Sequence, residues 1–339
     1  MSDPASEPLG GRHSALRSAR VAPPDAPAPP DAPASPAAPA YYTAPRPSLA
    51  GGLLRTARPK QWSKNVLVFA APGAAGVLGQ GSPLWRTAVA FALFCAVASG
   101  TYFLNDVLDA GADRLHPIKR NRPVAAGIVG PRIAVTTAVA LMACGIAGAT
   151  VLRWQLGVVL AIYLAVQFGY SFWLKHQPVM DLAAVASGFV LRGIAGAAAV
   201  GVPVSEWFLI VATFGSLLMV TGKRVAEHAE LGEDRGAHRA TLDAYSVTFL
   251  NTILAISAGG AIIGYCLWAF DLQTAALHHH DPIWFQLSIV PVVVALLRYT
   301  FLVEGGHGAK PEELVLSDRA LQVLGLIWVA LFAVGVYAG

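Results

Sequence analysis

The chain has 339 residues, 55% of them hydrophobic and 13% charged, with a mean hydropathy of +0.55 and a formal net charge of +4. Ordinary globular domains carry about 25% charged residues, so this composition excludes a soluble protein and predicts an all-α, polytopic membrane protein. The three cysteines, Cys95, Cys144 and Cys266, lie in apolar segments and have no zinc-site spacing, which assigns them to helix packing.

Residues 1–50 form a segment rich in proline, alanine and serine. A segment of this composition cannot bury a hydrophobic core, so we predict that it is disordered. It contains no apolar stretch typical of a signal peptide, and we expect no cleavage there. The folded transmembrane domain is predicted to span residues 51–339.

The rest of the chain contains nine apolar segments, each long enough, or nearly so, for a helix to cross a hydrocarbon core of roughly 30 Å. They are 66–80, 84–105, 130–151, 154–175, 179–202, 204–225, 245–270, 283–303 and 319–338. The first segment is interrupted by Pro72 and Gly73, so it is the least regular of the nine.

The positive residues orient these segments. Of the 24 lysines and arginines, only Arg86 and Arg153 fall on one side, Arg192 and Arg298 lie within spans, and all the others fall on the opposite side. The positive-inside rule then predicts a multi-pass protein of the inner (plasma) membrane with its N-terminus inside and its C-terminus outside. The long polar connections, and any active site that they carry, are predicted to face the cytoplasm.

The most informative stretch closes the second apolar segment and reads Asn-Asp-Val-Leu-Asp-Ala-Gly-Ala-Asp, from Asn105 to Asp113. On a helix, Asn105, Asp109 and Asp113 follow at intervals of four and Asp106 precedes Asp109 by three, so neighbouring oxygens share one face. Mg²⁺ prefers oxygen ligands and often takes one or two carboxylates plus substrate phosphates. The stretch therefore predicts a magnesium–diphosphate site at the cytoplasmic end of a membrane helix. The alternative is a solvated acidic helix end.

Basic residues follow the aspartates closely. Lys119 and Arg122 are placed to hold phosphates that a metal bridges, although a loop that only sets topology has the same composition. An arginine inside an apolar segment is costly, so Arg192 is expected to face a polar cavity or a partner. The run His278–Asp281 is predicted to lie on the outer side, far from the other polar groups, and we do not expect a specific metal site there.

Two other spans end in polar residues. Tyr170 and Lys175 close the fourth span, where the alternative roles are an interfacial aromatic and a snorkelling lysine. Lys223, Arg224 and Glu227 close the sixth span, and Lys223 and Glu227 also have the spacing of an ordinary helix pair.

The Asn105–Asp113 motif and the nine spans together resemble the UbiA superfamily of intramembrane prenyltransferases. The resemblance implies transmembrane helices around a central cavity, with a polar active site that binds an isoprenoid diphosphate through Mg²⁺. Members usually have a second aspartate-rich motif after the sixth span. Here that place reads Gly222-Lys223-Arg224-Val225-Ala226-Glu227, with two basic residues where a carboxylate is usual, which argues against an ordinary prenyl diphosphate donor.

Within the superfamily, the chain resembles a phosphoribosyltransferase branch of actinobacterial cell-wall arabinan synthesis. The matching stretches are 58–68, 105–127, 170–177, 222–227 and 298–322. The resemblance implies that 5-phosphoribosyl-1-diphosphate is the donor and that a polyprenyl phosphate, decaprenyl phosphate, is the acceptor. Extra cations at Lys223 and Arg224 would balance the charge of these two anionic substrates.

The resemblance also implies a role for each site residue. Asn105 and Asp109 hold Mg²⁺, and Asp106 and Asp113 complete or support its coordination. The substrate-binding residues are Lys64, Tyr102, Lys119 and Arg122 for the donor phosphates, Lys175 and Arg192 on a facing wall for the donor or the lipid phosphate, and Tyr170, Lys223, Arg224 and Glu227 around them.

Two other classes of protein remain open from the sequence. One is a conventional prenyltransferase with a prenyl diphosphate donor, against which the basic pair Lys223-Arg224 argues. The other is a transporter with a charged midplane site, but no repeat with broken helices is evident and the charged cluster lies at the cytoplasmic boundary. Besides its substrates and the lipid bilayer we expect no nucleic-acid partner, and the sequence leaves a homo-oligomer open.

Overall fold

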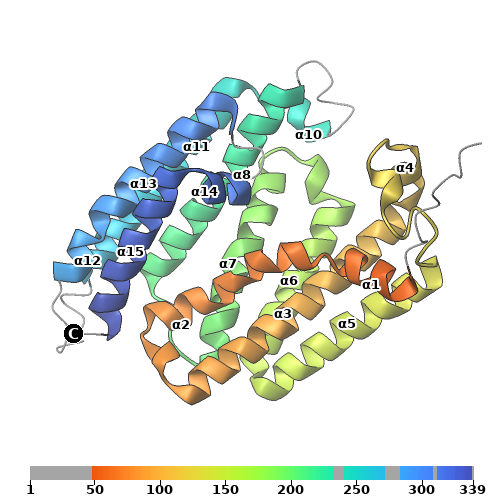
Figure 1. Cartoon of the computed structure of the whole chain (residues 1–339), viewed down its shortest axis with the longest axis horizontal. Helices are drawn as coiled ribbons and strands as arrows, with labels where there is room; N and C mark the ends of the chain where they lie inside the picture. The colour runs from red at the N-terminus through yellow and green to blue at the C-terminus, as the bar shows by residue number, and fades with distance from the viewer. Residues whose placement is uncertain (1–47, 232–239, 272–282, 308–310, 338–339) are drawn as a thin grey trace, which may run out of the picture. The chain divides into compact units, whose positions relative to one another are not determined.

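The structure, a computed structural model, describes residues 48–231, 240–271, 283–307 and 311–337 (Figure 1). Contacts within the chain separate Met1–Arg46 from a folded unit, Pro47–Gly339, to which all the described helices belong. The described residues of this unit form helices and turns and contain no strand. Most of the N-terminal segment 1–50, which was predicted to be disordered, lies outside the described residues, but a helix already begins at Leu49. The run His278–Asp281 also lies outside the described residues.

Eight helical segments of the described residues are long and apolar enough to cross a membrane. They are α3 (Gly81–Leu108), α5 (Pro131–Leu152), α6 (Trp154–Phe172), α7 (Met180–Val200), α8 (Glu206–Leu231), α11 (Val247–Asp271), α12 with α13 (Ile283–Leu287 and Ile289–Leu302, followed by the π-helical turn η6, Val303–His307), and α15 (Arg319–Tyr337). Each coincides with a predicted span to within a few residues, which confirms those eight predictions.

Shorter helices connect these spans. They are α1 (Leu49–Ala57), the 3₁₀ helix η1 (Pro59–Phe69), α2 (Ala70–Ala74), η2 (Val77–Gly79), α4 (Ala110–Leu115), η3 (Lys119–Asn121), η4 (Leu174–His176), α10 (Ala240–Asp243) and α14 (Pro311–Ser317). The predicted first span, 66–80, falls within η1, α2 and η2. A ninth continuous membrane helix is therefore not confirmed.

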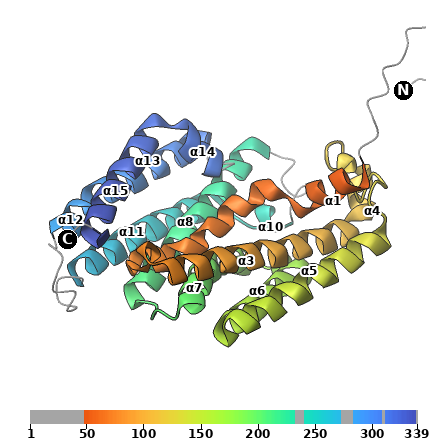
Figure 2. The same cartoon turned by 60° about the horizontal axis from the view of Figure 1, so that its bottom comes forward.

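The interrupted segment η1–α2–η2 runs along α3 in the opposite direction (Figures 1 and 2). Trp62 donates a hydrogen bond to Ser99 (3.1 Å) near the later part of α3, and Asn65 donates to the Cys95 sulfur (3.1 Å) one turn earlier in α3. Arg58 breaks the helix before Pro59 with a left-handed backbone (φ 53°, ψ 60°). The segment thus follows a path comparable to a membrane crossing without forming one regular helix.

A glycine on α7 explains why this segment lies so close to the bundle. A Cβ atom on Gly196 would collide with the backbone carbonyl of Val68 in η1. Since backbone cannot give way as a side chain tip can, we expect Gly196→Ala to lower the free energy of unfolding by about 1–3 kcal/mol, the range for overpacking. Gly259→Ala on α11, where no atom lies near the added methyl group, is the control and should be neutral or slightly stabilising. Thermal unfolding in detergent compares the two, and equal melting temperatures would contradict the prediction.

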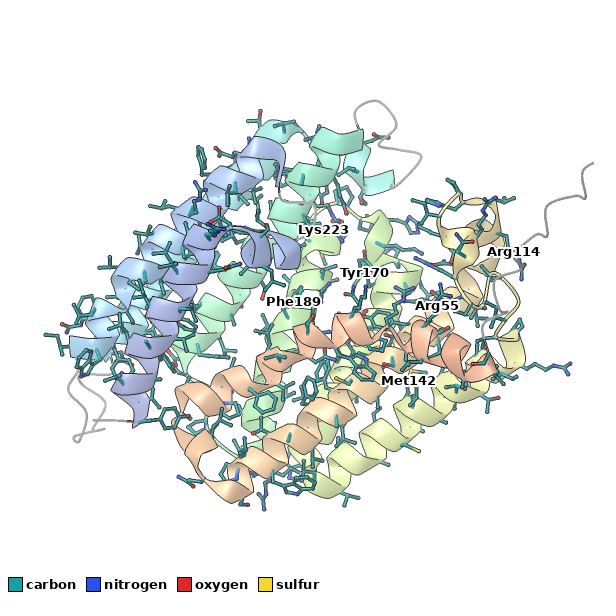
Figure 3. The ribbon with its side chains drawn as sticks, viewed as in Figure 1. Arg55, Arg114, Met142, Tyr170, Phe189 and Lys223 are labelled. Carbon is teal, nitrogen blue, oxygen red and sulfur yellow. The ribbon has the colours of Figure 1, made fainter. Side chains whose placement is uncertain are left out.

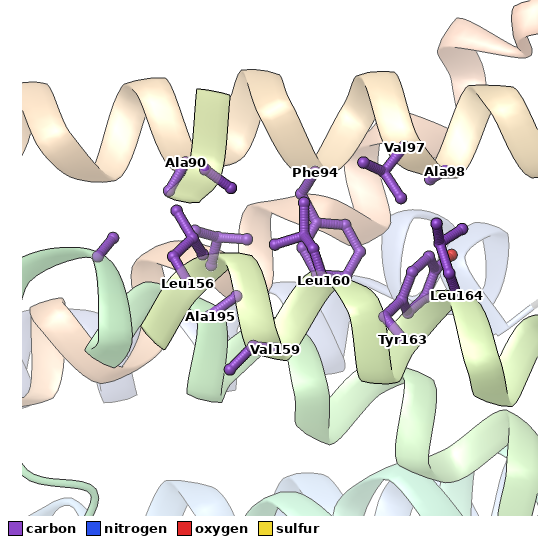
Figure 4. Close-up of a cluster of buried hydrophobic side chains, with 13 residues drawn as sticks. Ala90, Phe94, Val97, Ala98, Leu156, Val159, Leu160, Tyr163, Leu164 and Ala195 are labelled. Carbon is purple, nitrogen blue, oxygen red and sulfur yellow. The ribbon is translucent and has the colours of Figure 1, made fainter. Parts of the chain in front are cut away.

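The largest buried cluster joins α3, α6 and α7 (Figure 4). Phe94 of α3 lies against Tyr163 of α6, with ring centroids 4.6 Å apart, and Leu156 and Leu160 are fully buried beside them. A second cluster, centred on Leu218, Leu254 and Tyr299, joins α8, α11 and α13. Each long helix also packs against its neighbour in the sequence. Two smaller clusters lie at the helix ends that carry the polar residues, one with Phe103 and Ala110 and one with Leu182 and Tyr245.

The membrane orientation stays a prediction that rests on the positive residues. We expect a reporter fused after Gly339 to face outward and a reporter inserted between Arg235 and Arg239 to face inward, because the basic residues mark the inner side and three apolar spans separate the two positions. Alkaline phosphatase and fluorescent-protein fusions would check this. Both reporters on one side would exclude an odd number of crossings between the two positions.

Candidate active site

The last turn of α3 and the short helix α4 carry the predicted Asn105–Asp113 motif. Asp109 is the residue at which α3 ends and α4 begins, and its side chain is exposed. Asp106 and Asp113 point inward and are only 2% and 4% exposed. Asn105 is half-buried and accepts a hydrogen bond from the Ser171 hydroxyl at the end of α6 (3.1 Å). The motif therefore divides into a buried pair, Asp106 and Asp113, and a more exposed pair, Asn105 and Asp109.

Two arginines hold the buried pair of carboxylates. Arg58 donates to the Asp106 carboxylate at 2.5 Å, while Arg122 lies 3.5 Å from the same oxygen and 2.7 Å from Asp113. Both arginine side chains remain 30% exposed. A guanidinium has five N–H donors and a carboxylate occupies at most two or three of them, so each arginine keeps donors for an anionic ligand.

Arg58 is a site residue that sequence reasoning missed. Its left-handed backbone turns the side chain towards α3, where the guanidinium also lies over the Tyr102 ring, 4.9 Å from the centroid. A residue other than glycine in this conformation is uncommon and is held there by its surroundings. The available sequence signal was its place among the basic residues before Pro59, but nothing in the sequence distinguishes it from Arg55 or Lys60, which are exposed surface cations.

The more exposed pair, Asn105 and Asp109, has the oxygen donors that suit a hard divalent cation. In the described part of the chain, the Asp109 carboxylate has no hydrogen-bond or ion-pair partner. The Asn105 oxygen accepts from the Ser171 hydroxyl, which can rotate away and leave that oxygen for a cation. Among the same residues, no group of three or more His, Cys, Asp or Glu side chains is arranged to hold a metal. The residues present therefore fit a cation that takes few protein ligands and completes its coordination with water or phosphate.

The loop after α4 carries the predicted phosphate-binding cations. The His116 Nδ1 atom accepts hydrogen bonds from the backbone amides of Ile118 (3.2 Å) and Lys119 (3.3 Å). This contact orders the start of η3, from which Lys119 extends into solvent, while Arg122 at its end reaches Asp113. The structure thus brings Arg122 into the motif and places Lys119 at its rim.

The predicted facing wall is formed by the end of α6 and by η4. The Ser171–Asn105 hydrogen bond joins this wall to the motif, and Lys175 follows four residues later, half-buried. In the view of Figure 3, Tyr170 lies between Lys223 on α8 and Arg114 on α4. Lys64, on η1, is half-buried next to the buried Asn65. These positions agree with a shared polar region at one end of the bundle.

Arg192 lies behind this region, in the core. It is 6% exposed, and it donates to the Asn65 side-chain oxygen (2.7 Å) and to the carbonyl of Gly188 (2.6 Å). Three aromatic rings, those of Phe94, Tyr163 and Phe189, surround its guanidinium at 5.0–5.5 Å. The structure thus shows a cation that anchors η1 to α7 through Asn65. Direct substrate contact by Arg192, which the sequence resemblance implied, stays a prediction.

A second charged cluster joins α7 to α8. Arg224 is 3% exposed and lies 2.7 Å from Glu227 and 3.5 Å from the fully buried Asp181, while Lys223 is exposed and 3.7 Å from Glu227. The Tyr245 hydroxyl donates a short hydrogen bond to Asp181. Burial raises the pKa of Tyr245, and Asp181 raises it further, so the hydroxyl keeps its proton. The charge of Arg224 is therefore already matched by carboxylates within the protein.

A cavity of about 790 Å³ opens beside η1 and α2, and it is almost entirely apolar. Its lining comes from η1, α2, α8, α11 and α15 and includes Leu67, Phe208, Trp268, Trp328 and Phe332. A smaller apolar cavity of about 310 Å³ shares Leu67 and Phe208 with it and continues towards Met219 on α8. The two cavities together form an apolar space inside the bundle.

A family model described as the UbiA prenyltransferase family matches residues 66–321. The chain belongs to the UbiA prenyltransferase family. Over 300 residues it is 45% identical to the decaprenyl-phosphate phosphoribosyltransferase of Corynebacterium glutamicum, covering 86% of this chain and 89% of the relative. Over 304 residues it is 43% identical to the decaprenyl-phosphate phosphoribosyltransferase of Mycobacterium tuberculosis, covering 88% and 98%.

A solved UbiA homolog from Archaeoglobus fulgidus, bound to GPP and Mg²⁺, superposes on this UbiA-family chain with a TM-score of 0.61 at 21% identity. The superposition covers 85% of this chain and 100% of that one. At this identity the likeness shows the fold alone, and it confirms the predicted UbiA architecture.

Sequence reasoning on this UbiA-family protein missed four site residues, Arg58, Asn65, Asp181 and Tyr245. Arg58 directly precedes the interrupted segment and Asn65 lies on it. Asp181 lies at the start of α7, where the turn between α10 and α11 brings Tyr245 against it. Asp181 carried a signal, because a carboxylate at the start of an apolar span needs a partner. Its partner Arg224 lies more than 40 positions away in the sequence, so only the packed structure identifies the pair.

Proposed function

We propose that this protein transfers 5-phosphoribose from 5-phosphoribosyl-1-diphosphate to decaprenyl phosphate and releases diphosphate. The observation that carries the proposal is the 45% and 43% identity to two decaprenyl-phosphate phosphoribosyltransferases, along nearly their whole length. The cations around the Asn105–Asp113 motif support it, since a phosphorylated sugar diphosphate carries more negative charge than a prenyl diphosphate.

The donor would lie against the motif, with its phosphates on the arginines. Arg58 and Arg122 are prepared for this role because Asp106 and Asp113 fix their orientation and leave part of each guanidinium exposed. Planar guanidinium groups bind phosphate with two parallel hydrogen bonds. Lys119 at the rim and Lys64 on η1 would add charge without a fixed geometry.

Asn105 and Asp109 are the residues that would hold Mg²⁺, and a Mg²⁺-bound homolog of the same fold supports a divalent cation. When bound there, the ion neutralises charge on the departing diphosphate. The resemblance in sequence placed Asp106 and Asp113 in or around the metal coordination. We propose that they support the site through the arginines, because one oxygen of each carboxylate lies 2.5–2.7 Å from a guanidinium. Direct coordination of the metal by their other oxygens stays a prediction.

The lipid acceptor would place its phosphate in the polar region and its tail in the apolar space. The cavity of about 790 Å³, lined by aromatic and aliphatic side chains, supports a hydrocarbon occupant. One oxygen of the lipid phosphate attacks the anomeric carbon, the bond from that carbon to the diphosphate oxygen breaks, and the carbon inverts. The attacking oxygen is already ionised at neutral pH, so the protein does not need to remove a proton from it. The protein needs instead to position the two substrates and to neutralise their negative charge.

Purified protein in detergent tests the proposal with radiolabelled donor and decaprenyl phosphate. We expect diphosphate release and a labelled lipid product only when both substrates and Mg²⁺ are present. Geranyl diphosphate in place of the sugar donor should give no product. Prenyl transfer to an added acceptor, with no phosphoribosyl transfer, would overturn the proposal in favour of conventional prenyltransferase chemistry.

A further inference from the structure

One tyrosine hydroxyl joins two site segments that are far apart in the sequence. Tyr245 lies in the turn between α10 and α11, and its hydroxyl donates to the Asp181 carboxylate at the start of α7. The same oxygen accepts a hydrogen bond from the backbone amide of Val179 (2.6 Å). The ring is buried, and it stacks on Phe249 with centroids 5.8 Å apart and planes 5° from parallel. The position of the hydroxyl is therefore set by packing.

The amide that Tyr245 holds belongs to a strained residue. Val179 has φ 68° and ψ −45°, a backbone region that β-branched residues avoid. Such a conformation costs of order 1–3 kcal/mol and persists only where its surroundings enforce it. Here the hydrogen bond from the amide to Tyr245 and the hydrogen bond from Ala183 to the Val179 carbonyl (3.0 Å) supply that constraint.

The strained residue closes the turn that carries Lys175. That turn starts at Trp173, forms η4 and leads into α7 at Met180. Lys175 is half-buried and makes no ion pair with any residue that the structure describes. This contrasts with Arg224 in the same region, whose charge Asp181 and Glu227 match. A half-buried cation four residues after Ser171, which contacts Asn105 of the motif, is suited to an anionic ligand.

We propose that Tyr245 is a positioning residue, which holds the Val179 turn so that Lys175 meets the phosphate of a substrate. The proposal rests on the proposed function, because Lys175 would act on the anionic substrates of phosphoribosyl transfer. Tyr245 itself touches neither substrate. Asp181 orients the hydroxyl as its acceptor, and the charge of Arg224 stabilises that carboxylate in turn.

Tyr245→Phe tests the proposal, since it keeps the ring and removes only the hydroxyl. We expect the kcat/KM for phosphoribosyl transfer to fall by at least about fivefold, the factor that corresponds to one lost hydrogen bond of about 1 kcal/mol. Lys175→Met should also lower the kcat/KM for phosphoribosyl transfer. If Tyr245 acts through Lys175, the double variant should be no worse than Lys175→Met alone.

Thr87→Val is the matched control. Thr87 is fully buried near the start of α3, and its hydroxyl donates to the Pro83 carbonyl (2.8 Å), at the opposite end of α3 from the Asn105–Asp113 motif. The substitution therefore also removes one buried hydroxyl and keeps the shape of the side chain. We expect its kcat/KM to stay within about twofold of wild type, at a similar loss of melting temperature.

Hydrogen–deuterium exchange gives a readout that needs no turnover. Amides of residues 174–180 should exchange faster in Tyr245→Phe than in wild type, whereas their exchange should not change in Thr87→Val. Unchanged exchange in Tyr245→Phe, a kcat/KM equal to that of Thr87→Val, or fully additive losses in the double variant would each overturn the role of Tyr245. Absence of phosphoribosyl transfer by the wild type would instead overturn the proposed function, and the exchange data would still decide whether Tyr245 holds the turn.

Discussion

Asp109→Ala should lower phosphoribosyl transfer by at least about a hundredfold while the protein stays folded. Asp109 is exposed at the junction of α3 and α4, and its carboxylate has no partner in the described part of the chain, so its loss removes no packing. Replacing even a residue that only supports a metal ligand typically lowers metal affinity or activity by about 10- to 100-fold. Initial rates over a range of Mg²⁺ concentrations, together with melting temperatures, would measure both effects.

Glu206→Ala is the matched control for Asp109→Ala. Glu206 is an exposed carboxylate at the opposite end of α8 from Lys223 and Arg224. Its replacement should leave the rate within about twofold of wild type. Full activity of Asp109→Ala, or of the wild type in excess EDTA, would remove Asp109 from the proposed metal site.

Asp106→Ala should have a different signature, although it lies only three residues away. The substitution leaves Arg58 and Arg122 without their shared carboxylate and places two like charges near each other. Breaking a fully buried ion pair typically lowers the free energy of unfolding by about 3–5 kcal/mol. Because both guanidiniums are 30% exposed, we expect Asp106→Ala to lower it by about 2–3 kcal/mol. The KM for the donor should rise about tenfold, because both arginines lose their orientation. The Mg²⁺ concentration for half-maximal rate should not change.

Asp318→Ala provides the comparison for Asp106→Ala. Asp318 pairs with Arg298 at 2.8 Å and accepts a hydrogen bond from the Leu321 amide at the start of α15, away from the motif. Its loss should lower the melting temperature without raising the KM for the donor. A large shift of the Mg²⁺ requirement in Asp106→Ala would show instead that Asp106 is a metal ligand.

The membrane helices could be predicted because their signal is local. A run of about 20 apolar residues is sufficient to specify a spanning helix, since the bilayer requires every backbone hydrogen bond to be made within the segment. The exception is the first segment, where Pro72 and Gly73 predicted an interruption but not the path that the broken segment follows. The broken path depends on Gly196 of α7, which lets the Val68 carbonyl approach, and that contact joins residues far apart in the sequence.

The candidate site also has one part that the sequence predicts and another that depends on the tertiary structure. The sequence by itself determined which end of which helix carries the acidic motif, because N-D-x-x-D-x-x-x-D needs only helical spacing to gather its oxygens. Only the tertiary structure decided how those oxygens are used. Asp106 and Asp113 are buried and pair with Arg58 and Arg122, while Asn105 is half-buried and Asp109 is exposed. The structure likewise pairs Arg224 with Asp181 and gives Lys175 no ion pair among the described residues, because the partner of a buried charge is chosen by packing across helices and not by spacing along one.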